Sequence, residues 1–247
     1  AKVYVASVSA LNDSEQRGAS LAQQIVPWAG ANGGKVNLIG HSQGSPTSRV
    51  AASLRPDLVA SVTSINGVNK GSKVADVLRG VIPPNSAIEG GANGLANAIG
   101  GVINLLSGNN NPQNGLAALK TLTTAGTAAL NSRHPWGVNN SSYCAKSTEV
   151  HNVRGHNIRY FSWTGNASYT NVFDAVDPFL AITGLAFGSE KNDGLVGVCS
   201  TYLGQVIGDS YNMNHVDAIN HLFGIRGWTE PVSLYRQHAN RLKNKGV

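Results

Sequence analysis

The sequence has few charged side chains and no long apolar run. Only 13% of its 247 residues are Asp, Glu, Lys or Arg, against about 25% in ordinary soluble domains. No apolar stretch approaches the roughly 18 residues that a membrane helix needs, so no spanning segment is predicted. The 19 basic residues outnumber the 13 acidic ones, but they are scattered, and no zinc-finger or RNP pattern occurs. Nucleic-acid binding is therefore not expected.

Cysteine is also scarce, with only Cys144 and Cys199 in the chain. Two buried free thiols are one interpretation. Low charge and abundant Gly and Asn favour an exported protein, however, and there a single disulfide is the better explanation. The 41% content of hydrophobic residues excludes a disordered chain.

The first 66 residues alternate between β-branched segments and helical segments. Strands are expected at 2–8, 36–39 and 59–65, and helices at 14–28 and 45–54. This alternation predicts a parallel sheet with crossover helices. A further strand at 157–163 (NIRYFSW) resumes the sheet, so the chain is expected to form one α/β domain over 1–247.

The middle of the chain has no strand signals. Residues 73–132 are predicted to form a helical insertion, with a loop at 108–115 (GNNNPQNG) and a helix over 116–130. Short helices interrupted by glycine favour a movable cover, or lid, within 85–132. The alternative is an ordinary all-α second domain.

The strongest chemical signal is the pentapeptide Gly40-His41-Ser42-Gln43-Gly44, which follows an apolar strand and precedes a helix. A G-x-S-x-G sequence in this position predicts a nucleophile elbow, a sharp turn that exposes the serine at the carboxyl end of the sheet. Glycines two residues either side of Ser42 are expected because a side chain there would clash in the turn. A turn serine without function is the alternative.

A serine nucleophile needs a histidine base and a carboxylate that orients the base. Of the seven histidines, His215 lies in a polar loop before a helix, which suits a base, whereas His221 and His238 are expected to be structural. Asp193, in the turn KNDGLV, suits the acid. The residues alone leave three competing acids open, namely Asp174, Asp177 and Asp209.

Four long segments, in the same order along the chain, resemble a known protein family. The segments VNLIGHSQGSPTSRVAASLRPDLVASVTS, KNDGLVGVCS, YNMNHVDAINHLFG and VSLYRQHANRLKN resemble the secreted triacylglycerol lipases of the Pseudomonas and Burkholderia type over essentially the whole chain. The resemblance implies an α/β-hydrolase fold and a catalytic triad of Ser42, Asp193 and His215. It also implies a disulfide between Cys144 and Cys199 and an oxyanion donor at the backbone N–H of Gln43.

The same resemblance implies one structural Ca²⁺ beside the histidine loop. Its ligands would be the carboxylates of Asp174 and Asp217 and the backbone carbonyls of His221 and Ile225. Oxygen ligands suit a hard cation, although Asp217 could simply cap the helix that follows it. A zinc site at His215 and His221 is disfavoured because it would occupy the base.

One expected family feature has no match before Val36, namely the HG-containing loop that donates a second oxyanion N–H. The sequence begins on a segment expected to be an internal strand. We therefore expect a leading strand and loop to be missing from this chain, which would leave Gln43 as the only oxyanion donor. Losing one donor costs about 10²–10³ in kcat.

The function expected from the resemblance is hydrolysis of long-chain acylglycerol esters at an oil–water interface by a secreted, monomeric lipase. A membrane-anchored steric foldase, specific for the lipase, is the expected folding partner. Two alternatives remain: a short-chain carboxylesterase with the same triad, and a catalytically impaired lipid-binding relative.

Overall fold

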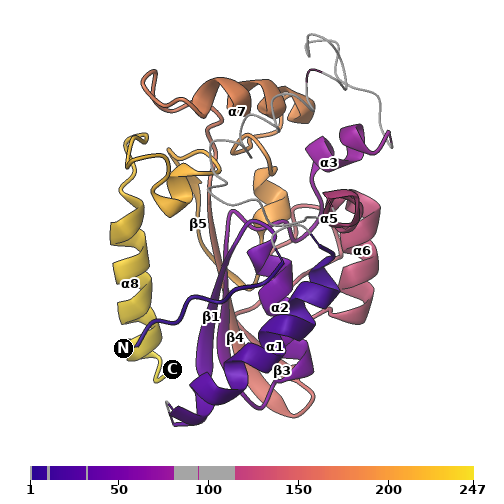
Figure 1. The fold of residues 1–247 in the computed structure, drawn as a ribbon, viewed down its shortest axis with the longest axis vertical. Helices are drawn as coiled ribbons and strands as arrows, with labels where there is room; N and C mark the ends of the chain where they lie inside the picture. Colours follow the sequence, from indigo (N-terminus) through magenta and orange to yellow (C-terminus); the bar gives the residue numbers. More distant parts are fainter. Residues whose placement is uncertain (1, 10–11, 32, 81–93, 95–114) are drawn as a thin grey trace.

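The computed structural model describes residues 2–9, 12–31, 33–80, 94 and 115–247 (Figure 1). The described strands are β1 (Val36–His41), β2 (Val59–Ile65), β3 (Val150–Val153), β4 (His156–Gly165) and β5 (Gln205–Tyr211). The α-helices are α1 (Ser14–Ala31), α2 (Gly44–Leu54), α3 (Lys73–Leu78), α5 (Gly115–Leu122), α6 (Thr124–Arg133), α7 (Asp177–Gly184) and α8 (Pro231–Asn244). The described residues also form three short 3₁₀ helices, η1 (Leu185–Phe187), η2 (Val198–Thr201) and η3 (Asp217–Ile219).

The sheet has the order β1-β2-β4-β3, and β5 also pairs with β4. The pairs β1–β2, β2–β4 and β4–β5 are parallel, whereas β3 and β4 form an antiparallel hairpin. The prediction of a parallel sheet with crossover helices is therefore confirmed. The strands β3 and β5 were not predicted, since β3 has only four residues and β5 (QVIGDSY) is mostly polar with a glycine at its centre.

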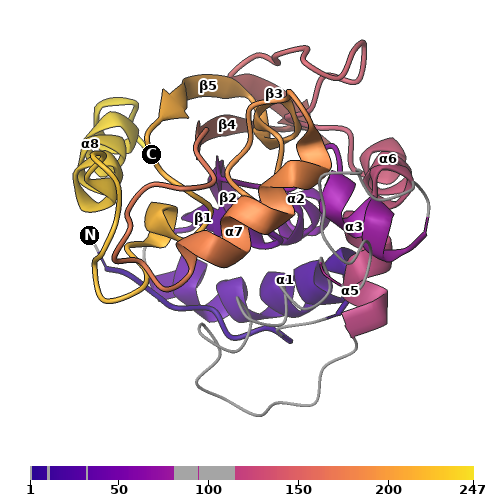
Figure 2. The ribbon, with the colours of Figure 1, turned by 90° about the horizontal axis from the view of Figure 1, so that it is seen from above.

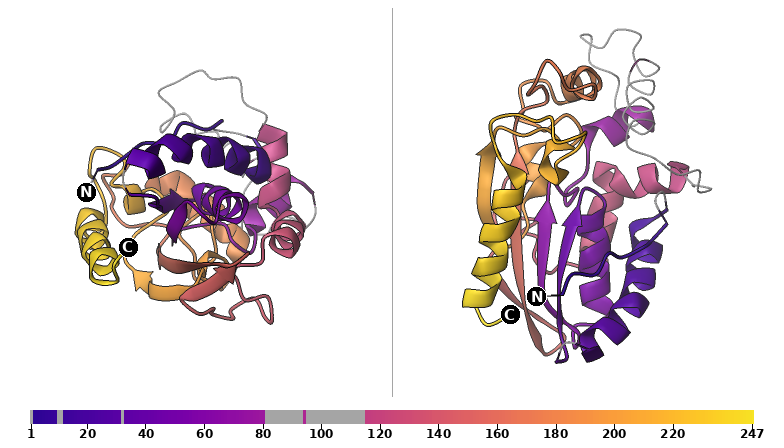
Figure 3. Two further views of the ribbon diagram at one scale, coloured as in Figure 1. Left: turned by 90° about the horizontal axis from the view of Figure 1, so that it is seen from below. Right: turned by 60° about the vertical axis from the view of Figure 1, so that its left-hand side comes forward.

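Helices cover both faces of the sheet, as the end-on view in Figure 2 and the side view in Figure 3 show. On one face, Leu21 and Ile25 of α1 pack in a cluster with Val62 and Tyr160 of the central strands. On the other face, α8 packs against Ile65 and Trp163. Side chains of alternate strand residues thus serve opposite layers, and every residue of the central strand β2 is buried.

The prediction of a strand at 2–8 is wrong. Residues 2–9 run beside α1 without entering the sheet, and their backbone bonds go to a side chain: Ser7 N donates to Gln24 Oε1 at 3.0 Å, and Gln24 Nε2 donates to Ser7 O at 2.7 Å. Tyr4 stacks on Trp28, while Val3 and Val5 are 88% and 90% exposed. Alternation of valines indicated a strand, but no described strand pairs with this segment.

The helical interpretation of 73–132 agrees with α3, α5 and α6 where the chain is described. Residues 81–93 and 95–114, including most of the expected lid and the loop at 108–115, lie outside the described residues. The helix α6 is fixed to the main body, because buried Arg49 of α2 donates to Asn131 Oδ1 at 2.8 Å and to the carbonyl of His134 at 2.7 Å. Among the described helices, none is long and apolar enough to cross a bilayer.

The carboxyl ends of the parallel strands meet at the end of the molecule that carries α7, at the top of Figure 1. The loops after β1, β2 and β5 converge there. Ligand sites of open α/β sheets lie at this edge.

Candidate active site

Ser42 lies at a sharp turn between β1 and α2. Its backbone φ is +54°, in the left-handed region that side chains other than glycine rarely adopt. Its N–H donates to the carbonyl of Ile65 at 3.0 Å, and its carbonyl accepts from the N–H of Val68 at 3.3 Å. The strained serine is therefore held by the end of β2, in the geometry of a nucleophile elbow.

The two glycines of the pentapeptide have different surroundings. A Cβ on Gly40 would run into the backbone carbonyl of Gly44 and lie 2.7 Å from the N of Ser45. A Cβ on Gly44 would meet no described atom within 4 Å. The steric requirement expected on both sides of Ser42 thus holds at Gly40, and the described chain imposes none at Gly44.

The structure brings Asp193 and His215 together. His215 Nδ1 lies 2.8 Å from Asp193 Oδ2, and the His215 N–H donates to the Asp193 carbonyl at 2.8 Å. Asp193 is fully buried and His215 is 3% exposed. A histidine held in this way keeps its proton on Nδ1, which donates to the carboxylate, and so Nε2 is left to accept a proton.

The three competing acids contact other groups. Asp209 accepts from Lys146 Nζ and the Tyr202 hydroxyl. Asp177 has both oxygens occupied, since Oδ2 accepts from the N–H of Asn171 and Oδ1 from the amide of Asn214. Asp174 Oδ1 accepts from the N–H of Val176. Of the four candidates, only Asp193 has a described hydrogen bond to His215.

Asp193 is a buried carboxylate with four donors. Oδ1 accepts from the N–H groups of Leu195 and Val196 at 2.9 and 2.7 Å, and Oδ2 accepts from His215 and from the Asn66 amide at 2.7 Å. Burial by itself raises the pKa of Asp193, but His215 and the backbone donors outweigh it and hold that pKa below its ordinary value. Asp193 therefore stays ionised at neutral pH.

Two further residues beside the nucleophile shape the site. His41 Nε2 lies 2.7 Å from the His215 carbonyl, and the two imidazole rings are 4.6 Å apart. Burial, with help from His215, lowers the pKa of His41 to about 3, so His41 is neutral. The Gln43 N–H, the expected oxyanion donor, donates to no acceptor in the described chain. The contact of His41 with His215 was missed, because sequence places His41 in the elbow without showing where its ring lies.

The carboxylates expected to bind Ca²⁺ lie beside the base loop. Asp174 is 2% exposed and Asp217 fully buried, and one oxygen of each, Asp174 Oδ2 and Asp217 Oδ1, has no hydrogen-bond partner. Burial, together with Asp177 and Asp217, raises the pKa of Asp174 to about 6, and burial also raises the pKa of Asp217. Neither carboxylate forms an ion pair with a described residue, and buried charges of like sign are unfavourable unless a cation joins them.

The other expected ligands suit the same cation. No described donor reaches the backbone carbonyls of His221 or Ile225. The residues present therefore fit a hard cation with oxygen ligands. In the described part of the chain, no group of three or more His, Cys, Asp or Glu side chains is placed to hold a metal ion, so such a site depends on carbonyls.

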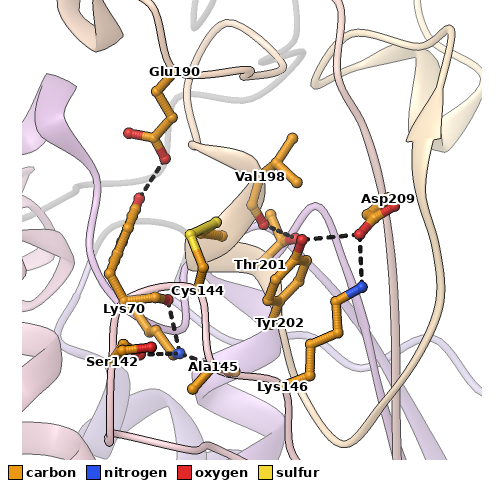
Figure 4. Close-up of a disulfide and its surroundings, with 12 residues drawn as sticks. Lys70, Ser142, Cys144, Ala145, Lys146, Glu190, Val198, Thr201, Tyr202 and Asp209 are labelled. Carbon is orange, nitrogen blue, oxygen red and sulfur yellow. Dashed lines mark hydrogen bonds and ion pairs between the residues drawn. A yellow bond between two sulfur atoms is a disulfide. The ribbon is translucent and has the colours of Figure 1, made fainter.

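The disulfide between Cys144 and Cys199 is confirmed. It joins the exposed loop before β3 to η2, six residues after the acid, and Figure 4 shows its surroundings. Lys70 Nζ donates to the carbonyls of Ser142, Tyr143 and Ala145 at 3.0, 2.8 and 2.9 Å. The loop that carries Cys144 is thus held by a covalent bond and by an ammonium group.

Comparisons with known proteins agree with the fold and identify the family. Residues 29–89 match the family described as alpha/beta hydrolase fold. The chain is 53% identical to a triacylglycerol lipase of Vibrio cholerae over 251 residues, covering 100% of this chain and 78% of that protein. It is 40% identical to one of Pseudomonas fragi and 38% identical to one of Burkholderia plantarii, covering 100% of this chain and 86% and 78% of theirs.

A solved structure supports the fold. The mature Bacillus licheniformis lipase BlEst2 is similar with a TM-score of 0.54 and 21% identity, over 83% of this chain and 68% of that one. A likeness at this identity concerns the fold, whereas the full-length sequence matches concern the family. The chain belongs to the bacterial triacylglycerol lipases of the α/β-hydrolase fold.

Proposed function

We propose that this protein hydrolyses long-chain acylglycerol esters through Ser42, His215 and Asp193. The observation that carries the proposal is the buried Asp193–His215 pair at 2.8 Å, together with a serine held at a φ of +54° in the elbow between β1 and α2. The full-length relatives, each named as a triacylglycerol lipase, support the substrate class.

In the proposed mechanism, the Ser42 hydroxyl attacks the ester carbonyl while His215 Nε2 takes its proton. His215 then delivers that proton to the departing alkoxide, which leaves an acyl-enzyme on Ser42. Water attacks the acyl group with His215 again as base, which releases the fatty acid and restores Ser42. Asp193 keeps the imidazole oriented and stabilises its positive charge, and the Gln43 N–H stabilises the oxyanion.

The calcium proposal assigns the carboxylates of Asp174 and Asp217 and the carbonyls of His221 and Ile225 as ligands. A Ca²⁺ held by these residues would supply positive charge and would join the loops that carry Asp174 and Asp217. Asp217 lies two residues after His215, and its Oδ2 already accepts from the N–H of Asn214 at 3.1 Å. Fixing Asp217 therefore fixes the loop that presents the base.

Secretion, a foldase partner and a monomeric state complete the proposal. The surface disulfide is typical of exported proteins and so supports secretion. The foldase rests on the family resemblance alone. The lid is proposed to lie before α6, because Arg49 ties α6 to α2.

The deciding experiment compares the unaltered protein with Ser42→Ala on emulsified triacylglycerol and on a soluble short-chain ester. A fluorophosphonate should label the unaltered protein at Ser42 with full stoichiometry, and the variant should lose both labelling and more than about 10³ of the rate. A preference for the soluble ester would favour a carboxylesterase. A folded protein without labelling would be the impaired lipid-binding relative and would refute the proposal.

A further inference from the structure

Asn66, the residue that follows β2, contacts the proposed catalytic acid, Asp193. Its amide Nδ2 donates to Asp193 Oδ2 at 2.7 Å, the same oxygen that receives His215 Nδ1 at 2.8 Å. Asn66 is fully buried. Both acceptor directions of the oxygen that faces the base are therefore occupied, one by the base and one by Asn66.

The local conformation of Asn66 is unfavourable in two ways. Its φ is +47°, in the left-handed region, where Asn is better tolerated than most side chains but glycine is preferred. Its Oδ1 is buried without a hydrogen-bond partner, which also destabilises the folded state. A strained backbone and an unpaired buried polar atom at the same residue are typical of functional sites. Here Nδ2 donates to Asp193 and, at 3.5 Å, to the Asn214 carbonyl, whereas Oδ1 is left without a partner.

The backbone around Asn66 joins the acid to the nucleophile. The Asn66 N–H donates to the Trp163 carbonyl at 3.1 Å, which anchors the residue to β4. On either side of it, the Ile65 carbonyl and the Val68 N–H hold the backbone of Ser42. A shift in the position of Asn66 would therefore move Asp193 through the side-chain hydrogen bond. It would also move the Ser42 backbone through Ile65 and Val68.

We propose that Asn66 is a positioning residue for the reaction, which fixes Asp193 Oδ2 toward His215 Nδ1 without touching the substrate. The two backbone donors hold Oδ1, but they leave the direction of Oδ2 to His215 and Asn66 alone. Without the amide, Oδ2 gains freedom or recruits water, and the imidazole loses its fixed orientation. This role rests on the proposed catalytic use of Asp193 and His215.

The test replaces Asn66 by glycine, which suits the left-handed backbone and removes only the side chain. Turnover of a soluble ester should show kcat lowered about tenfold with KM unchanged within twofold. Rates are divided by the active fraction titrated with a fluorophosphonate. Asn66→Ser, whose hydroxyl is too short to reach Oδ2, should behave in the same way and serves if the glycine variant folds poorly.

A matched control and a spectroscopic readout separate positioning from simple stabilisation. Asn69 is an equally buried asparagine that donates to Ser64 Oγ and to the Thr201 carbonyl, so Asn69→Ala should lower the melting temperature with kcat unchanged. In the proton NMR spectrum, the low-field resonance of His215 Nδ1–H should move in both Asn66 variants and remain in place in Asn69→Ala.

Unchanged kcat in Asn66→Gly, or an unmoved low-field resonance, would overturn the assignment. If the proposed hydrolase function itself were wrong, the unaltered protein would lack both turnover and Ser42 labelling, which distinguishes that outcome from failure of the Asn66 assignment. In that case the resonance shift still reports whether Asn66 positions the Asp193–His215 pair.

Discussion

Gly40 and Gly44 flank Ser42 symmetrically in the sequence, but they are not equivalent in space. A methyl group on Gly40 would overlap the Gly44 carbonyl, and this is backbone that cannot move without unwinding the start of α2. We expect Gly40→Ala to abolish Ser42 labelling and to destabilise the fold by at least about 2 kcal/mol.

Gly44→Ala is the matched comparison, since its methyl group would meet no described atom. We expect this variant to stay within about 0.5 kcal/mol of the parent in stability and to remain labelled at Ser42. Denaturant unfolding and fluorophosphonate titration measure both quantities. Equal damage in the two variants would show that something else constrains the elbow.

His238 on α8 gives the fold a pH dependence of its own. It is fully buried against Phe161 and Trp163, and its Nε2 lies 2.7 Å from Thr63 Oγ1. Burial, with Arg241 adding to it, lowers the pKa of His238 to about 4, whereas the unfolded chain keeps the ordinary value near 6.5. Between these values the unfolded state binds more protons, so stability should fall as the pH drops from about 6.5 to about 4.

Urea unfolding of the parent and of His238→Gln over this pH range measures that contribution. The variant carries no titrating group at this position, so its stability should lose less than that of the parent as the pH falls. The difference between the two proteins isolates His238 from the other groups that titrate there. Parallel curves would contradict the lowered pKa.

At the scale of elements, the two loops around Asp174 and Asp217 should depend on calcium. Each carboxylate has one buried oxygen without a partner, and the two raise the energy of one another while no cation joins them. Excess EDTA should therefore lower the melting temperature by about 5–10 °C, as expected for loss of a ligand held at about 100 times its Kd.

Asp174→Asn and Asp217→Asn should remove the response to EDTA. Asp209→Asn is the control, because this carboxylate binds Lys146 and Tyr202 away from the pair, and the EDTA response should persist in it. Calcium content is measured directly by metal analysis. A melting temperature that EDTA does not change, in a sample without bound calcium, would refute the site.

The elements differ in how far the sequence could predict them. β1, β2 and β4 were predictable because each contains β-branched or aromatic residues in a short run that ends at a glycine or an asparagine, and β2 is buried along its whole length. Residues 2–8 have the same composition, but strand formation needs a neighbouring strand, and here Gln24 of α1 takes the backbone groups instead. Whether a segment pairs as a strand depends on distant parts of the chain, so a local sequence pattern cannot predict it.

The site was predictable to a similar extent. Ser42 was predictable because it lies in a G-x-S-x-G motif whose first glycine the tight turn requires. The acid and the base were predictable from their order along the chain and from the family resemblance. Asn66 and His41 were missed because their roles come from where neighbouring strands place them. An asparagine after a strand ordinarily indicates a turn, so only its contact with Asp193 distinguishes Asn66.

At the scale of the whole molecule, large apolar side chains are exposed at the end that holds the site. They lie on two loops, before α7 and before α8, that a hydrogen bond from Asn171 Nδ2 to the Arg226 carbonyl joins at 2.9 Å (Figure 1). The exposed fractions are high at the loop tips: Val172 72%, Phe173 82%, Phe223 90% and Trp228 93%. Apolar groups exposed in this way mark surfaces that meet another apolar phase.

For a lipase, that phase is the substrate surface, and contact there would bring the carboxyl edge of the sheet to the lipid. We expect Phe173→Ser and Trp228→Ser each to lower the rate on emulsified triacylglycerol about tenfold, since burying an aromatic side chain contributes about 1.5–3 kcal/mol and these tips would be partly buried. The rate on a soluble short-chain ester should stay within twofold. Val150→Ser, at a 43% exposed residue of β3, is the control and should change neither rate. Equal losses on both substrates would mean that the tips support the active site itself, and an unchanged emulsion rate would show that the protein meets lipid through another face.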